Sequence, residues 1–447
     1  MLSGGLNSPL PAGFGPPQPR VGAHAVRPSG LLARAFRRLS GVGTVRLRHI
    51  SLTNFRNFVR LELDLPAHIV LLQGDNAQGK TNFLEAIYYL ATARSPFATA
   101  DRQLINWLAG EEGTPFARLV AQVERGGDLQ RIEIVLLEEP TAEEPHRCRK
   151  VVRINGVPKR VLDLVGQMKV VLFMPQHLDL VAGPPSARRH YLDATLCQLD
   201  ARYRRSLARY SRILTQRNHL LRSLQERRGD LDELLFWDRK LAEEGAYIMA
   251  RRQSAIAGLN ELAQAIHLDL TGGKERLRLR YLPSIEVPDV GYQMSLGLAL
   301  KSQPPAPGVQ RIAEAFLERL RQARGEEIQR GMSLFGPHRD EMRFLVGGVD
   351  LGLYGSRGQQ RTAVLALKLA ELELVRREAG EEPILLLDEV MSELDRAHRR
   401  YLMEVISGAQ QTILTATDLS DYSPDFLAQA TLLRVREGRI EKITNRE

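Results

Sequence analysis

Cysteine is scarce in this chain of 447 residues, in which only Cys148 and Cys197 occur. Two cysteines cannot form a framework of disulfides, and their spacing is not that of a metal site. This usage is typical of reduced thiols in the cytosol, so we expect a cytoplasmic protein. Long hydrophobic runs are missing as well. No stretch approaches the roughly 18–20 apolar residues of a membrane span, and we expect no membrane partner.

Acidic residues and lysine are absent from residues 1–44, which contain five arginines and six prolines. The segment begins without charge and lacks the apolar core of a secretory signal. Its composition is similar to that of a transit peptide, although the prolines oppose an amphipathic helix over most of it. We expect a disordered extension that stands outside the fold, or the product of an upstream start.

Positive charge is in modest excess, and part of it lies in that extension. The whole chain has 62 basic and 53 acidic residues, a net charge of +9. Without residues 1–44, the balance falls to 57 against 53, a net charge of +4. The total charge is therefore a weak argument for a nucleic-acid partner.

The order of apolar and polar residues predicts an α/β fold. Residues 45–52 and 59–65 alternate in polarity, as half-buried strands do. Residues 69–73 are nearly all apolar, which is typical of a strand covered on both faces. A glycine-rich loop then leads into a predicted helix over residues 81–92.

The middle of the chain changes its pattern. Residues 116–176 are rich in predicted strands, and Asn155-Gly156 indicates a two-residue hairpin turn. From residue 188 to about 270 the apolar residues recur at helical spacing without a sustained heptad, which predicts long amphipathic helices and no long coiled coil. Residues 286–310 are rich in proline and are expected to be irregular. Strands return in the last third, with a helix over residues 359–377.

The strongest motif follows the buried strand at residues 69–73. It matches G-x-x-x-x-G-K-[ST], and it opens the next predicted helix. Glycines let the backbone wrap a phosphate, and successive N–H groups at the helix start face the anion. Lys80 would neutralise the β- and γ-phosphates of ATP, and Thr81 would bind Mg²⁺. The expected nucleotide-binding residues are Gly74, Asp75, Asn76, Ala77, Gln78, Gly79, Lys80 and Thr81.

A second motif is the apolar run at residues 384–387, which ends in Asp388 and Glu389. A buried strand would deliver both carboxylates to its carboxyl edge, where open α/β sheets place their ligands. Asp388 suits the shell of Mg²⁺, and Glu389 suits a catalytic base that activates water. An ordinary strand end is the alternative for such a run, but the phosphate loop favours the catalytic interpretation.

A third motif, Ser356-Arg357-Gly358-Gln359-Gln360, precedes a predicted helix. It resembles the S-G-G-Q signature of ABC ATPases, with Arg357 in place of the first glycine. Residues 392–395 resemble the D-loop of the same superfamily. In ABC ATPases the signature serine binds the γ-phosphate held by the other subunit, which assigns Ser356, Gly358 and Gln359 to the nucleotide site. A serine N-cap is the structural alternative.

Longer strings narrow the resemblance to the RecF family of SMC-like ABC ATPases. They include Phe55-Arg56-Asn57, GDNAQGKTN followed by LEAIYYLATARSPF, and residues 336–340 (GPHRD). The run YGSRGQQRTAVLALKLAE, LLLDEVMSELD, and Arg188-Arg189 with Leu192-Asp193 belong to the same set. The resemblance covers roughly residues 46–440.

The resemblance implies an α/β fold with an ABC/SMC-type P-loop ATPase head, a mixed sheet and a mainly helical second domain. We expect residues 46–190 and 331–447 to form the two parts of the head and residues 191–330 to form the helical lobe. It further implies a homodimer that forms on binding ATP and Mg²⁺, with slow ATP hydrolysis in which Lys80 and Glu389 are catalytic. The implied partners are single- and double-stranded DNA, with a preference for single-stranded and linear or gapped DNA. The RecO and RecR mediators, which load RecA in repair and in the SOS response, are implied as protein partners.

Two positions depart from ABC transporters. Gln176 stands where those proteins have the Q-loop glutamine, so it is a candidate nucleotide contact, although RecF proteins often carry an acidic residue there. Thr417-Asp418 stand where transporters have the switch histidine, which opposes a transporter ATPase. His338 and Arg339 are expected to have a structural or dimer-contact role.

The predicted helical lobe is dense in arginine, and several of these residues share a face opposite the apolar stripe. Such a face could contact DNA phosphates, or it could be an ordinary solvated surface. Tyr203 and Tyr210 fall on the apolar stripe, where core packing is favoured over base stacking. The arginines concerned are Arg202, Arg204, Arg205, Arg209, Arg212, Arg217, Arg222, Arg227 and Arg228.

Three other functions compete with a RecF-like ATPase. They are the ATPase subunit of a transporter, a P-loop kinase of a small molecule, and another SMC-like DNA-organising ATPase. A kinase would leave the signature and the D-loop without purpose. A chromosome-organising relative would need arms longer than an insertion of roughly 140 residues provides, since ~70 helical residues span only about 100 Å.

Overall fold

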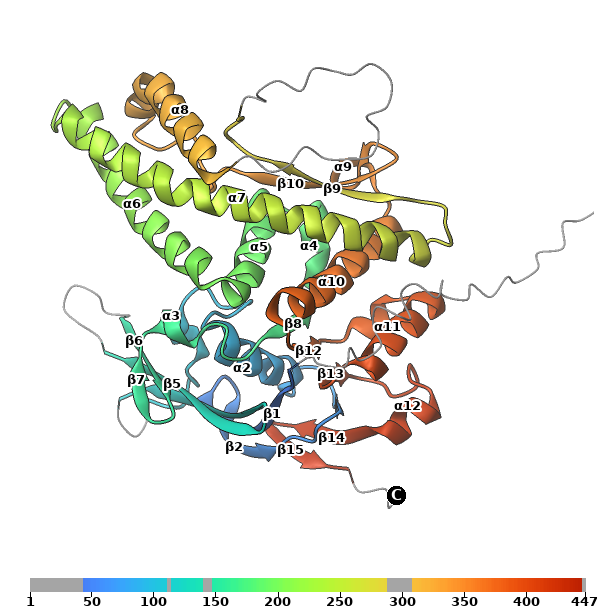
Figure 1. Ribbon diagram of the computed structural model, residues 1–447. Helices are drawn as coiled ribbons and strands as arrows, with labels where there is room; N and C mark the ends of the chain where they lie inside the picture. The colour runs from blue at the N-terminus through green and yellow to red at the C-terminus, as the bar shows by residue number, and fades with distance from the viewer. Residues whose placement is uncertain (1–42, 111–113, 140–146, 288–307, 444–447) are drawn as a thin grey trace, which may run out of the picture.

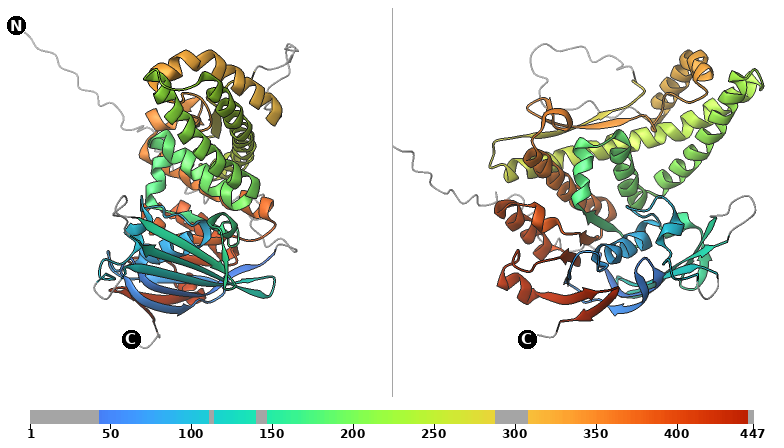
Figure 2. Two further views of the ribbon diagram at one scale, coloured as in Figure 1. Left: turned by 90° about the vertical axis from the view of Figure 1, so that its left-hand side faces the viewer. Right: turned by 180° about the vertical axis from the view of Figure 1, so that it is seen from behind.

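The computed structural model describes residues 43–110, 114–139, 147–287 and 308–443. Two six-stranded sheets form one side of the molecule, and long helices with a three-stranded sheet form the other (Figure 1, Figure 2). None of the helices in these ranges is long and apolar enough to cross a membrane.

The central sheet has the strand order β15-β14-β3-β13-β12-β8, and β15 alone runs antiparallel to its neighbour. Its inner strands are apolar and buried because both faces of the sheet are covered. The strands are β3 (Ile69–Gln73), β8 (Val170–Phe173), β12 (Ile384–Leu387), β13 (Thr412–Ala416), β14 (Ala430–Arg436) and β15 (Arg439–Lys442).

The second large sheet is antiparallel, with the order β2-β1-β4-β5-β6-β7. The predicted alternation over 45–52 and 59–65 is confirmed by β1 and β2. The predicted hairpin turn is also confirmed, because Asn155 and Gly156 have φ angles of 51° and 80° between β6 and β7. The strands are β1 (Val45–Phe55), β2 (Phe58–Asp64), β4 (Phe116–Arg125), β5 (Asp128–Glu138), β6 (Cys148–Ile154) and β7 (Val157–Lys159).

The helical side is built on α7 (Leu231–Leu270), which packs against α6 (Ala201–Gln225) and α8 (Val309–Arg330). The predicted long helices are confirmed, and Tyr203 and Tyr210 are buried in their core. The small sheet has the order β11-β10-β9 and covers α7. Its strands are β9 (Leu277–Leu282), β10 (Glu341–Val346) and β11 (Val349–Asp350).

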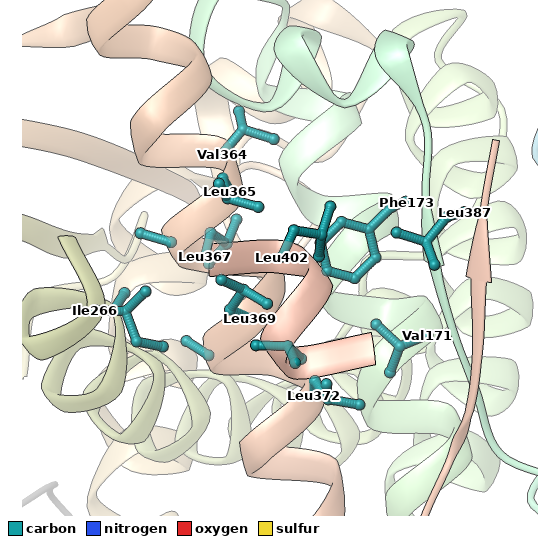
Figure 3. Packing of buried hydrophobic residues seen from close by; sticks show 14 of the residues in the cluster. Val171, Phe173, Ile266, Val364, Leu365, Leu367, Leu369, Leu372, Leu387 and Leu402 are labelled. Atoms are coloured by element: carbon teal, nitrogen blue, oxygen red, sulfur yellow. The ribbon is translucent and has the colours of Figure 1, made fainter. Parts of the chain in front are cut away.

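Helix α10 (Arg357–Ala379) lies where the two sides meet. Its apolar residues pack against β8, β12, α7 and α11 (Arg396–Gly408), as Figure 3 shows. Leu367, Leu369 and Leu372 are completely buried there. A helix that is apolar around most of its circumference belongs in a core, and this one joins the lobe to the head.

The remaining helices are short or flank the sheets. Helix α2 (Lys80–Thr92) fills the space between the two large sheets, which gives the central sheet a core on each face. The others are α3 (Val161–Leu164), α4 (Asp179–Ala182), α5 (Pro185–Leu199), α9 (Leu351–Tyr354) and α12 (Pro424–Gln429), with 3₁₀ turns η1 (Asp101–Leu104), η2 (Pro175–Leu178) and η3 (Val390–Glu393).

Two of the predicted domain boundaries, at residues 44 and 330, lie close to residues that are paired with other parts of the fold. The extension predicted over 1–44 lies outside the described residues as far as 42, but Gly43 pairs with Glu381 and Thr44 accepts a hydrogen bond from Gly126. The division proposed at residue 330 falls between β9 and β10, which are neighbours in one sheet. Most of the proline-rich segment predicted to be irregular, 288–307, lies outside the described residues.

Candidate nucleotide-binding site

The predicted phosphate loop joins β3 to α2, as its motif requires. Gly79 has a φ angle of +116°, and Ala77 is also left-handed at +64°. These angles turn the chain so that the N-terminus of α2 opens onto the loop (Figure 1). The loop residues from Asp75 to Ala77 are exposed, so successive backbone N–H groups are available to an anion.

The side chain of Asn57 supports the phosphate loop through hydrogen bonds. In the sequence, Asn57 was notable only as part of the Phe55-Arg56-Asn57 string that resembles the RecF family. Asn57 Nδ2 donates to Gln78 O (2.9 Å), and Asn57 Oδ1 accepts from Asn82 Nδ2 (2.8 Å). A Cβ on Gly79 would lie 2.5 Å from Asn57 Nδ2, so glycine is required by the contact as well as by its φ angle. The Phe-Arg-Asn string was the available signal for this role.

The turn between β14 and β15 supports the loop from a second direction. Gly438 N donates to Gln78 O (3.1 Å), and Glu437 N donates to Gln78 Oε1 (2.7 Å). A Cβ on Gly438 would lie 2.3 Å from Asn57 O, so the turn and Asn57 pack without room for a side chain. Sequence reasoning missed this contact because it joins segments more than 350 residues apart.

Lys80 lies under the loop and is almost completely buried. Its Nζ donates to the carbonyl oxygens of Gly74 (2.7 Å) and Asp75 (3.0 Å), and it lies 2.9 Å from Glu389 Oε1. The buried charge is therefore paired and hydrogen-bonded, as burial demands. A γ-phosphate would compete with Glu389 for the same ammonium group.

Asp388 follows β12 and meets Thr81, which confirms that the structure brings the two predicted metal ligands together. Thr81 Oγ1 lies 3.0 and 2.9 Å from the two carboxylate oxygens, and Thr415 Oγ1 donates to Oδ1 (2.9 Å). Burial raises the pKa of Asp388, and the two hydroxyl donors oppose that rise. A divalent cation placed between Thr81 and Asp388 would favour the ionised carboxylate.

Glu389 has a left-handed backbone with a φ angle of 49°, which is uncommon outside glycine. Its N–H donates to Thr415 Oγ1 (2.9 Å), which holds the turn. The side chain is 32% exposed, so it borders solvent on one side and Lys80 on the other. Such a carboxylate can accept a proton from a water molecule once Lys80 is drawn to a phosphate.

The signature motif begins α10, and Ser356 is its N-cap. Ser356 Oγ accepts from Gln359 N (3.2 Å), and Gln359 Oε1 accepts from Ser356 N (3.1 Å), which completes a capping box. Gln359 Nε2 also donates to Glu275 Oε1 (2.9 Å). Ser356 and Gly358 are exposed. Within the described ranges, the hydrogen bonds of Ser356 stay in its own motif and do not reach the phosphate loop.

Gln176 lies in η2, directly after β8, and its side chain is exposed. Strand β8 neighbours β12, so Gln176 and Asp388 follow adjacent strands of the central sheet. Thr417-Asp418 follow β13. Asp418 accepts from Ser420, a local turn contact.

Most of the arginines predicted to share a face of the helical lobe are exposed, and the prediction is wrong for Arg204 and Arg217. Arg217 is completely buried and pairs with Asp238 and Glu327. Arg204 donates to main-chain carbonyls, and Arg209 pairs with Glu244. The positions that remain exposed without an acidic partner among the described residues are Arg202, Arg205, Arg212 and Arg222 of α6, and Arg227 and Arg228 just after it.

His338 has a structural position, in line with one of the two predicted roles. Its Nδ1 lies 2.7 Å from Tyr210 OH and its Nε2 lies 3.3 Å from Ser333 O. Burial lowers the pKa of His338 to about 4. A neutral ring suits both contacts, since Nε2–H can donate to the carbonyl while Nδ1 accepts from the phenol. Arg339 likewise donates to Ser333 O (3.2 Å).

Known proteins are similar to this chain over most of its length. The family model described as "RecF/RecN/SMC N terminal domain" matches residues 46–423. The DNA replication and repair protein RecF of Chloroflexus aurantiacus is 46% identical over 403 residues, which cover 88% of this chain and 99% of that protein. The RecF of Bacillus velezensis is 36% identical over 399 residues, which cover 89% and 100%.

A solved structure gives the same result. The structure described as "recombination mediator protein RecF-ATP in RecFOR pathway" superimposes with a TM-score of 0.77 at 30% identity, and covers 91% of this chain and 99% of its own. The predicted fold, an ABC/SMC-type P-loop head with a helical second domain, is confirmed. These relatives set aside the transporter and the small-molecule kinase. The chain belongs to the RecF family of DNA replication and repair proteins.

Proposed function

We propose that this chain is an ATP-controlled DNA-binding protein in which two copies close on DNA when each binds ATP and Mg²⁺. The observation that carries the proposal is the separation of two phosphate-binding elements within one chain. The phosphate loop opens α2 in the head, whereas Ser356 opens α10 beside α9 and the small sheet (Figure 1). Each chain therefore supplies two half-sites that a second copy can complete.

The surface around Ser356 supports a second copy as the missing partner. Leu353 and Tyr354 are 71% and 77% exposed directly before the signature. Exposed apolar side chains beside an unused helix N-terminus are suited to an interface that forms only in one state. ATP would join the two surfaces because its γ-phosphate would meet Lys80 of one subunit and the α10 N-terminus of the other.

Mg·ATP would rearrange contacts that are already in place. Lys80 would leave Glu389 for the β- and γ-phosphates, and Thr81 and Asp388 would hold Mg²⁺, whose charge would neutralise the phosphates. Glu389, released from Lys80, would then accept a proton from the attacking water. Glu389 becomes available as a base only after the γ-phosphate has taken its place beside Lys80. We therefore propose that hydrolysis is slow and that it separates the two copies. Gln176 is proposed as an outer contact to the metal or the γ-phosphate.

The place of this reaction is recombinational repair. A related structure is described as a recombination mediator of the RecFOR pathway. We propose that this chain acts with RecO and RecR in the cytoplasm, binds single-stranded, linear or gapped DNA, and helps to load RecA during repair, fork maintenance and the SOS response.

The test is DNA binding under three nucleotide conditions. Labelled gapped, single-stranded and blunt duplex DNA are titrated with the protein in ATP, in ADP and without nucleotide, all with Mg²⁺. We expect tighter binding in ATP, and the same protein carrying Lys80→Ala should not respond to ATP. Affinity that is indifferent to nucleotide would contradict an ATP-controlled clamp.

A further inference from the structure

The outward face of the small sheet is strongly basic. Along β9 the residues alternate, so that Leu277 and Leu279 are buried against α7 while Arg278 and Arg280 are exposed on the opposite face. Arg276, just before the strand, continues the exposed row. Side chains two residues apart on one face of a strand are separated by about 6.8 Å, so the three arginines form a row of about 14 Å.

A fourth arginine lies directly across from this row. Arg343 of β10 is the register partner of Arg280 and is exposed with it. Like charges directly opposite each other destabilise a sheet. Asp350 lies 3.6 Å from Arg343, so one carboxylate serves this face. We define the basic face as Arg276, Arg278, Arg280 and Arg343.

Two acidic residues at the ends of these strands have partners outside the basic face. Glu341 forms a two-pronged pair with Arg188, and Glu275 accepts from Gln359 of the signature. Among the described residues, Arg276, Arg278 and Arg280 have no salt bridge. This contrasts with Arg204, Arg209 and Arg217 of α6, whose charges are used internally.

The strands of the basic face are connected to the signature motif at Ser356 by a hydrogen bond and by the chain itself. Glu275 binds Gln359 immediately before β9 begins, and β11 leads through α9 directly to Ser356. Helix α9 also packs on β10. The sheet and the start of α10 therefore form one unit, and β9 and β10 lie on the far side of α7 from the head (Figure 1, Figure 2).

We infer that the basic face of β9 and β10 binds the phosphate backbone of duplex DNA. This inference rests on the proposed function and names the surface through which DNA would be held. An unneutralised row of arginines matches the charge of a phosphodiester backbone, and the repulsion between Arg280 and Arg343 is relieved by a polyanion. Arginine forks suit phosphate oxygens.

The surroundings favour duplex over single-stranded DNA. Sites for single strands combine basic residues with aromatic side chains on which bases stack. The aromatic residues of β9 and β10, Tyr281 and Phe344, point inward, where Tyr281 OH bonds Asp340 and Phe344 joins the core. The strands themselves thus offer charge without a stacking platform. Contacts of this kind position a duplex without reading its sequence.

The test compares two charge-matched triple variants. R276Q/R278Q/R280Q removes the row on β9, and R205Q/R212Q/R222Q removes three exposed, unpaired arginines of α6. Binding of a labelled blunt duplex is measured with ATP and Mg²⁺ between about 50 and 200 mM salt, a range over which phosphate contacts lose affinity steeply. The β9 variant should lose at least about tenfold in affinity, and its slope of log affinity against log salt should be shallower by about 2.7, since each phosphate contact contributes about 0.9. The α6 variant should keep the wild-type slope.

Folding is checked independently of DNA. Removing Arg280 also removes a like-charge pair, so the β9 variant should unfold at the wild-type temperature or slightly above it, and ATP binding should be unchanged. Equal losses in both variants would show a general charge effect and overturn the inference. Wild-type affinity in the β9 variant, or loss restricted to single-stranded DNA, would also overturn it while leaving the proposed function standing. Failure of the wild-type protein to bind any DNA would instead remove the proposed function.

Discussion

The side chains of the nucleotide-binding site contact one another although they come from distant parts of the chain. Thr81 and Asp388 are 307 residues apart, yet the threonine hydroxyl contacts both carboxylate oxygens. Lys80 and Glu389 form an ion pair over a similar separation. The motifs predicted which residues would meet, since their chemistry is fixed by the phosphates and the metal they serve. The motifs did not predict the direct contacts that Thr81 makes with Asp388 and Lys80 makes with Glu389.

Asn57 gives a prediction at this scale. Asn57→Ala removes the bonds to Gln78 and Asn82, and two hydrogen bonds of this partly buried kind correspond to about 1–3 kcal/mol. We expect ATP affinity to fall roughly 5- to 100-fold with little change in the unfolding temperature, because the loss falls on the ordering of the loop. Calorimetric titration with ATP measures the affinity, and Gln429→Ala on the exposed side of α12 is the control. Unchanged ATP affinity would show that the loop holds its shape without Asn57.

Among the helices and strands, α10 begins at a serine, Ser356, for which we distinguish two roles. Ser356 caps the helix in the isolated chain and is proposed to meet the γ-phosphate of a second copy. Aspartate is as good an N-cap as serine, but its charge opposes a phosphate. The two roles therefore respond differently to two substitutions.

Ser356→Ala should cost about 0.5–2 kcal/mol of stability, whereas Ser356→Asp should leave the stability near the wild-type value. Both variants should fail to dimerise with ATP. Chemical denaturation measures the first effect and light scattering the second. An S356D protein that still dimerises with ATP would remove the serine from the composite site.

His338 makes the free energy of unfolding of the protein depend on pH. Its folded pKa of about 4 lies below its ordinary value of 6.5, so the unfolded state binds the proton more tightly. The stability it contributes is complete above pH 6.5 and is lost as the pH falls towards 4, up to about 3 kcal/mol. In His338→Asn this contribution is missing. The free energy of unfolding of the variant should therefore fall less than that of the wild type between pH 7 and pH 4.5, and parallel curves would contradict a neutral buried ring.

The helices and strands show how far periodicity can predict a fold. Strands buried on one face and amphipathic helices were predicted because the pattern of burial is written in local sequence. The pairing of β9 with β10 was not, because a disconnected strand pair leaves no local signal, and α8 lies between them. Arg217 illustrates the opposite error. A charged residue in an amphipathic helix is predicted to be exposed. Arg217 is buried because it pairs with Asp238 and Glu327, which come from two other helices.

In the whole molecule, each proposed nucleotide site is shared between the phosphate loop of one chain and the signature of another. Lys80→Ala disables the phosphate loop of its own chain, and Ser356→Ala disables the signature that it offers to another. Each variant alone should remain monomeric in ATP. Mixed in equal amounts, they form one intact site between the loop of the S356A chain and the signature of the K80A chain, so part of the mixture should dimerise and regain ATPase activity. Recovery that is no greater than the sum of the separate variants would contradict sharing between chains.

The mass of the wild-type protein in solution shows whether ATP joins two copies into a dimer. Sedimentation at micromolar concentration with Mg²⁺ should give a monomer without nucleotide and in ADP, and a dimer in ATP or a slowly hydrolysed analogue. A protein that remains monomeric in ATP, or one whose mass is the same under all of these conditions, would contradict the account.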